Sequence, residues 1–354
     1  MKLRSASLAL GFSLLLAPAV LRAWDYEGHR MVNQVALAAL PKDFPAFVQA
    51  PAAAERIAFL AGEADRWRNL SYDQPLYNGA AMDHYFDVEQ VTLAGLDRAK
   101  LPSLRYEFAA QFAAGRAAHR DEFPPIDEAR NSGHTREWCG FLPWAVAENF
   151  HKLRAAFSYL KTFEELGTKE EIANAQANVL YYMGFLGHFV GDGAQPLHST
   201  HHSNGWAGPN PHGYTIWPGF HSWIDSGFIA KAGIKFADLA PRVTPAGVIS
   251  LAPRPDGRDA MFVAVVDYLL VQHQRVEPLY QMEKAGQLGH GEQPVLDETR
   301  AFIQGQLLVG GEMLAAIWAT AWKGTVPDTF LRAALLKRDG GAAPVKAKAK
   351  KRVP

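Results

Sequence analysis

The sequence has 354 residues with 36 basic and 36 acidic side chains, so its formal net charge is zero. A chain without excess positive charge has no general field for polyanions, and phosphate chemistry would need bound metal or individual arginines. The single cysteine, Cys139, excludes an intramolecular disulfide. With 48% hydrophobic residues, the chain can still build a large core.

Residues 1–23 have the order of a signal peptide: a charged start with Lys2 and Arg4, an apolar run over 8–17, and the small Ala23. The apolar run is too short to cross a bilayer. We expect cleavage after Ala23, with cleavage after Ala19 as the alternative. The product is then secreted or periplasmic, with no stable membrane insertion.

Apolar residues at three- and four-residue spacing predict helices over 31–40, 51–69, 142–163, 169–192, 258–281 and 298–322. Alternating runs typical of strands are scarce, and the segment 203–220, rich in glycine and proline, predicts a loop. The sequence therefore predicts an all-α fold. We expect a single, mostly helical domain over 24–338 and a flexible basic tail over 339–354.

The stretch HFVGDGAQPLHSTHH, residues 188–202, contains four histidines and an aspartate. His188 and Asp192 are four residues apart, which places them on one face of a helix, and His198 follows a proline bend. Imidazole nitrogens and carboxylate oxygens are ligands that zinc accepts. Further residues of these types, at positions compatible with helices, are His29, Asp65, His84, His221 and Asp225.

The unbroken motif HFVGDGAQPLH resembles the superfamily of zinc-dependent nucleases and phospholipases C, which includes single-strand-specific nucleases of the S-one/P-one type. The other ligand positions of that superfamily are filled in order from Trp24 to Asp225. The resemblance covers residues 24–230 well and the later helices loosely. It implies a bacterial member with a trinuclear zinc cluster, three Zn²⁺ in all, at the base of a cleft.

The resemblance also implies how the ions are held. One ion takes Asp65, His84, His188 and Asp192. A second shares Asp192 as a bridge and takes His29 together with the α-amino nitrogen and carbonyl oxygen of Trp24. The third takes His198, His221 and Asp225. We interpret His201, His202 and His212 as loop residues that are not ligands.

By the same resemblance, the protein is expected to be a phosphodiesterase that uses a metal-activated hydroxide. Its expected substrates are single-stranded DNA or RNA and 3′-nucleotides, its products carry 5′-phosphates, and it acts as a monomer. Asp65 would orient the attacking water, and Arg68 would bind the phosphate. Tyr85 would stack on a nucleobase, to which Asp87 would form a hydrogen bond.

Two alternatives remain open at the level of sequence. A zinc-dependent phospholipase C acting on phosphatidylcholine is favoured by Glu27, which matches the acidic member of a choline cage. However, Arg66 and Ala81 stand where that cage has aromatic residues. Trp206 and Ala207 interrupt the Gly-Gly-Asn of the nucleases, which weakens base recognition. The other alternative is a zinc-binding protein without turnover.

Overall fold

The computed structural model describes Trp24 and residues 26–338, so the expected signal peptide and basic tail lie outside the described residues. The only β feature in this part of the chain is an isolated bridge between Leu288 and Val295. The remaining regular structure is helical. The predicted all-α fold, a single mostly helical domain, is confirmed.

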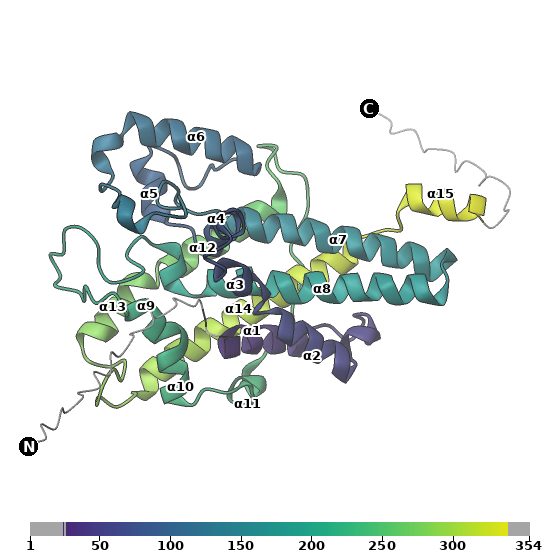
Figure 1. Ribbon diagram of the computed structural model, residues 1–354. Coiled ribbons are helices and arrows are strands. Elements are labelled where there is room, and N and C mark those ends of the chain that lie inside the picture. The colour runs from purple at the N-terminus through teal and green to yellow at the C-terminus, as the bar shows by residue number, and fades with distance from the viewer. Residues whose placement is uncertain (1–23, 25, 339–354) are drawn as a thin grey trace, which may run out of the picture.

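Helix α8 lies at the centre of the core. Figure 1 shows it running beside α7, with α14 and α1 packed against the pair and α2 along its flank. Helix α12 packs against α7. The bounds of these helices are α1 Tyr26–Ala39, α2 Pro51–Leu60, α7 Leu142–Leu166, α8 Lys169–Ala194, α12 Ala260–His273 and α14 Asp297–Lys323.

The two ends of α8 differ in character. At its start, the Thr168 hydroxyl and the Glu171 carboxylate form a capping box, which satisfies two free backbone N–H groups. Its last twelve residues, from Met183 to Ala194, are all buried. A helix end that is buried on every side must pair its polar groups internally. His188 and Asp192 lie on this buried end.

Shorter helices surround the core. They are α3 (Glu63–Arg68), α4 (Gln74–Ala81), α5 (Val88–Leu93), α6 (Arg105–Ala118), α9 (Phe220–Ser222), α10 (Phe228–Ala232), α11 (Phe236–Leu239), α13 (Val276–Lys284) and α15 (Thr329–Arg338). Two predicted helices are divided. The segment 51–69 forms α2 and α3, and the segment 258–281 forms α12 and α13.

The break between α2 and α3 exposes a backbone carbonyl that binds a predicted metal ligand. The carbonyl oxygen of Ala61 accepts a hydrogen bond from Nδ1 of His188 at 2.6 Å. Gly62 follows, and a Cβ on it would lie 2.6 Å from Cδ2 of the Tyr26 ring. Helical periodicity continues through 51–69, but the sequence carries no local sign of these two long-range contacts.

Among the described helices, α14 alone has the length and apolar composition needed to cross a membrane. However, 56% of its most apolar stretch is buried inside the protein. It packs against α1, α7 and α8, and its fully buried residues include Leu307, Leu314 and Trp318. A core helix has this same composition, and α14 occupies that position here.

Glycine at position 187 is required where α8 meets α1. A Cβ there would lie 1.8 Å from Oδ1 of Asn33. The Asn33 amide donates to the carbonyls of Ile57 and Gly184, at 2.8 and 3.1 Å. We expect Gly187→Ala to lower the free energy of unfolding by about 1–3 kcal/mol, because overpacking displaces this amide.

The matched control is Gly305→Ala within α14, where nothing lies within 4 Å of an added Cβ. This change should leave stability unchanged or raise it by up to about 1 kcal/mol, because alanine favours helix. Urea denaturation of both variants measures the difference. Equal stability of the two variants would contradict the packing described for Gly187.

Candidate metal centre and cleft

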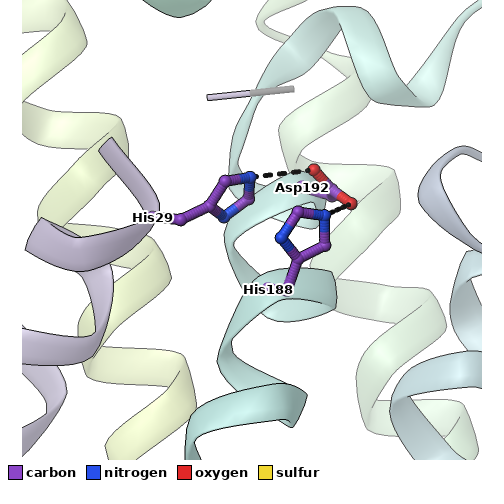
Figure 2. A group of neighbouring side chains, drawn as sticks. All are labelled: His29, His188 and Asp192. Atoms are coloured by element: carbon purple, nitrogen blue, oxygen red, sulfur yellow. Dashed lines mark ion pairs between the residues drawn. The ribbon is translucent and has the colours of Figure 1, made fainter. Parts of the chain in front are cut away.

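The predicted ligand side chains meet at the buried end of α8. They form three groups of potential metal ligands, and within each group the ligand atoms all lie within 4.8 Å of one another. Figure 2 shows the first group, with both imidazoles turned toward the carboxylate. The groups are His29, His188 and Asp192; Asp65, His84 and His188; and His198, His221 and Asp225.

Asp192 is the central carboxylate and is fully buried. Its Oδ2 lies 3.0 Å from Nδ1 of His84 and 3.3 Å from Nε2 of His188. Its Oδ1 lies 3.5 Å from Nε2 of His29 and 3.6 Å from Nδ1 of His198. The two oxygens therefore face histidines from four different segments, which is the arrangement that a bridging carboxylate needs.

Backbone carbonyls orient two of the imidazoles. Nδ1 of His188 donates to the Ala61 carbonyl, and Nδ1 of His198 donates to the His84 carbonyl. Each bond leaves Nε2 as the nitrogen with a free lone pair. Nε2 of His188 then lies 2.9 Å from Nδ1 of His84. A second hydrogen bond of this kind commonly fixes the orientation of metal-binding histidines.

The third group is built by α9 and the π-helical turn η6 (Trp223–Gly227). Nε2 of His221 lies 3.0 Å from Oδ2 of Asp225 and 3.0 Å from Nε2 of His198. The Gln195 amide donates to Oδ1 of Asp225 at 2.7 Å. One carboxylate oxygen is therefore held by the protein, and the other faces the two imidazoles.

Many of these buried polar atoms have no hydrogen-bond partner, although such atoms are normally paired inside proteins. Four such atoms of the predicted ligands are His29 Nδ1, His29 Nε2, His84 Nε2 and Asp192 Oδ1. Asp65 Oδ1 and Asp225 Oδ2 also form no hydrogen bond, although they lie 2.7 Å from Arg68 and 3.0 Å from His221. Their donor set of imidazole nitrogen and carboxylate oxygen is the one that zinc prefers. The residues present thus fit divalent metal.

Several of the pKa shifts suit metal binding, whereas for His188 the effect of burial is outweighed by Asp192 and Asp65, which raise its pKa. Burial lowers the pKa of His29 well below its usual value and lowers that of His84 to about 4, so both imidazoles are neutral. Burial opposes ionisation of Asp192, but the neighbouring His188 and His198 hold its pKa well below the usual range. Neutral imidazole and ionised carboxylate are the forms that bind metal.

Trp24 lies beside the ligands at the start of the described chain. Its side chain is fully buried, and its indole N–H donates to the carbonyl of Gly191 at 2.8 Å, next to Asp192. Gly28 allows this approach, because a Cβ there would lie 2.9 Å from Cβ of Trp24. The expected cleavage after Ala23 falls outside the described residues.

The two predicted catalytic residues also lie at the centre. Asp65 Oδ1 is 3.8 Å from Nε2 of His188 and 3.9 Å from Nδ1 of His84. Arg68, one turn later on α3, forms an ion pair with Asp65 at 2.7 Å. Arg68 also lines a cavity of about 710 Å³ that includes His84, His198 and His221. Of the two predicted catalytic residues, Arg68 alone is among the described residues that line this cavity.

Tyr85 and Asp87, the predicted nucleobase contacts, line the same cavity. The Tyr85 hydroxyl donates to the Thr135 carbonyl at 3.2 Å, which fixes its ring. Oδ2 of Asp87 accepts a hydrogen bond from the Gln90 amide at 2.8 Å. Burial and the nearby Glu89 raise the pKa of Asp87 to about 8, so this carboxyl group is mostly protonated at neutral pH.

Asp87 should therefore make stability depend on pH. The folded state keeps this proton up to a pKa of about 8, whereas the unfolded state releases it near pH 4. Stability due to Asp87 is thus present below about pH 4 and is lost as pH rises toward 8. We expect Asp87→Asn to gain stability relative to wild type across this window, by up to about 1.4 kcal/mol per pH unit.

Urea denaturation of both proteins at pH 5, 6 and 7 measures this difference. Both proteins carry every other titrating group, so the difference between their unfolding free energies isolates the contribution of Asp87. If the difference in unfolding free energy stayed the same from pH 5 to pH 7, Asp87 would be ionised in the folded protein over this range.

A fourth group of potential ligands, formed by Glu89, His201 and His202, was not predicted. Glu89 and His202 have partners within the protein, whereas Nδ1 of His201 has no hydrogen bond and lies 3.5 Å from Oε2 of Glu89. The Glu89 carboxylate accepts from the Thr200 hydroxyl at 2.6 Å and from the His201 backbone N–H at 3.2 Å. Nδ1 of His202 accepts the Ala207 N–H at 3.1 Å. These bonds anchor the loop after His198, and no sequence spacing links Glu89 to it.

Comparisons of the chain with models of protein families, with curated proteins and with solved structures found no match.

Proposed function

We propose that the chain is an exported zinc-dependent phosphodiesterase that hydrolyses single-stranded nucleic acids to products with 5′-phosphates, and that it also releases phosphate from 3′-nucleotides. One observation carries the proposal: three groups of potential metal ligands converge around the buried carboxylate of Asp192. Three of these potential ligands, His84, His198 and His221, line a cavity that Arg68 also lines. The ligand sets drawn from the sequence, with three zinc ions, remain part of this proposal.

Bound zinc supplies Lewis acidity toward the phosphate and lowers the pKa of a ligated water to about 7. The protein's own side chains supply orientation. Asp65, whose Oδ1 lies 2.7 Å from the Arg68 guanidinium and 3.8 Å from Nε2 of His188, would orient the attacking water. Arg68 presents a planar set of N–H donors, which matches the oxygens of a phosphate.

The residues that line the cavity do not support the phospholipase alternative. Glu27, the residue that matches a choline cage, is exposed, and it is not among the described residues that line the cavity. The guanidinium of Arg66 lies over the Phe59 ring at 4.4 Å and pairs with Glu63. An aromatic ring covered by a cation is a poor site for choline.

The proposal is tested with one panel of substrates: single-stranded and duplex DNA, RNA, 3′-nucleotides and phosphatidylcholine, each with and without chelator. We expect single strands to be cut at least about tenfold faster than duplex, because stacking of an unpaired base contributes about 1–3 kcal/mol. Products should carry 5′-phosphates, and chelator should abolish activity. Rapid hydrolysis of phosphatidylcholine with inert nucleic acid would reverse the assignment.

A further inference from the structure

The cavity continues beyond the metal ligands into a region that the assigned roles do not use. We call this region the distal arm and define it by five lining residues: Arg116, Pro124, Ile126, Arg136 and Trp138. It combines apolar and aromatic surface with two cationic side chains. Channels for single-stranded nucleic acid share this combination, because bases stack on aromatic rings while cations contact the backbone.

Arg116 lies in the last turn of α6 and is half-buried. Its guanidinium lies over the ring of Phe123, 4.3 Å from the ring centroid. It forms no ion pair with another residue of the described chain, and burial lowers the pKa of this guanidinium. An arginine stays charged even so, and an anionic ligand would compensate a half-buried, unpaired charge.

Arg136 is exposed and lies in a loop whose backbone is held by side chains. Its backbone N–H donates to Oδ1 of Asn131 at 3.1 Å, and the Asn131 amide donates to Glu137 at 2.7 Å. The Tyr85 hydroxyl binds the carbonyl of Thr135. The arginine side chain therefore projects from a fixed backbone and, like Arg116, has no ion pair within the described residues.

The same loop is joined to the segment that carries a predicted metal ligand. The Asp87 N–H donates to the Cys139 carbonyl at 2.7 Å, and the Phe141 N–H donates to the Met82 carbonyl at 2.6 Å. His84 lies between these two attachments. The distance between the distal arm and the metal ligands is consequently set by backbone hydrogen bonds, as a substrate bound at both places requires.

The lining of the distal arm offers two arginines to an anion. The two carboxyl groups that line the cavity near it are Asp87 and Asp127. Asp87 has a pKa of about 8 and so carries little charge at neutral pH. Asp127 accepts the N–H of Ala129 at 3.1 Å. The Glu137 carboxylate, which accepts from the Asn131 amide, also acts on Arg116. Neither arginine forms an ion pair within the described residues, and arginine forks match phosphate oxygens.

We propose that Arg116 and Arg136 bind a second phosphate of the substrate, the one next to the phosphate that is cleaved. The substrate is then a polynucleotide, whose backbone supplies a second phosphate, rather than an isolated phosphodiester. The inference rests on the proposed function, because it needs the scissile phosphate to lie at the metal ligands. It assigns a role to two residues that the resemblance leaves without one.

The test compares substrates with one and two phosphates. Bis(p-nitrophenyl) phosphate has one phosphate. Without terminal phosphates, a dinucleotide also has one and a trinucleotide has two. We expect the Arg116→Gln/Arg136→Gln double variant to lose at least about 100-fold in kcat/KM on the trinucleotide, since hydrogen bonds to charged groups contribute about 1.5–3 kcal/mol each and two are removed. The two single-phosphate substrates should change less than about twofold. Arg120→Gln is the matched control, because Arg120 is exposed and lies outside the described lining of the cavity.

Binding provides a readout that is independent of turnover. Fluorescence anisotropy with a phosphorothioate single strand, at several salt concentrations, measures the affinity of wild type and variants. The double variant should bind more weakly and should show a salt slope smaller by about 0.7, the value for one phosphate contact on a single strand. Circular dichroism checks that the helical fold is unchanged.

The outcomes separate the two proposals. If the variant loses activity equally on all three substrates, or if wild type gains nothing from the second phosphate, the second-phosphate site is wrong and the phosphodiesterase remains. If wild type hydrolyses no phosphodiester, the proposed function is wrong, and unchanged binding in the variant would then overturn the site as well. If inorganic phosphate inhibited wild type and the double variant equally, phosphate would bind at a site other than Arg116 and Arg136.

Discussion

Asp192→Asn is expected to retain the helical fold and to reduce bound zinc from about three ions to about one per chain, if usual zinc ligand sets apply. The buried carboxylate faces His84 and His188 with one oxygen, and His29 with the other. Asparagine has the same shape but lacks the negative charge and the second oxygen ligand. Both proposed zinc sites that share Asp192 should therefore lose affinity.

Phosphodiesterase activity should fall by more than about 100-fold in this variant. Removing a residue that only orients a metal ligand already costs about 10–100-fold, and Asp192 is proposed as a ligand itself. The loaded protein should also become less stable, because metal that binds only the folded state adds its binding free energy to folding. Metal analysis, thermal unfolding and the substrate panel measure the three effects.

His198→Ala is the comparison variant, because His198 belongs to the third group alone. It should lose mainly one ion and most activity, while stability falls less than in Asp192→Asn. Circular dichroism should be unchanged in both. Equal metal loss in the two variants would remove the bridging role from Asp192.

Helical spacing in the sequence identified two pairs of potential metal ligands that the structure brings together. His188 and Asp192 share one face of α8, as a spacing of four residues requires. His221 and Asp225 were found in the same way, although a π-helical turn begins between them. The long apolar-patterned helices α7, α8 and α14 were predicted nearly to their ends, since burial of one continuous face leaves a regular pattern.

Features that depend on distant contacts were not predictable. The break after α2 exists because the Ala61 carbonyl turns toward His188, and the break after α12 follows His273, whose Nδ1 donates to the Ser199 carbonyl at 3.0 Å. The distal arm depends on the loop that carries Arg136. That loop is fixed by side chains from other segments, so no periodicity in its own sequence marks it.

A protein that begins at Trp24 is expected to bind about one more zinc ion than the same protein with one extra residue before it, if amine and carbonyl complete a zinc site. A free α-amino group has a pKa of about 7.7–8.0, and its neutral form binds metal, whereas an amide nitrogen is a poor ligand. Trp24 is buried, and its indole binds Gly191 beside Asp192. The residue thus lies next to the proposed bridge.

The experiment compares exported protein with a cytoplasmic form that carries methionine before Trp24. Terminal sequencing identifies each start, metal analysis counts ions, and a phosphodiesterase assay measures turnover, which we expect to fall by more than about 100-fold, as for the loss of a direct ligand. Trp24→Phe on the exported form is the control. It removes the indole hydrogen bond to Gly191 but keeps the free amine and carbonyl, so its zinc content should equal that of wild type. If the methionine-extended form keeps all its zinc and full activity while Trp24→Phe loses metal, Trp24 acts through its side chain alone, and the ligand set of the second ion is wrong.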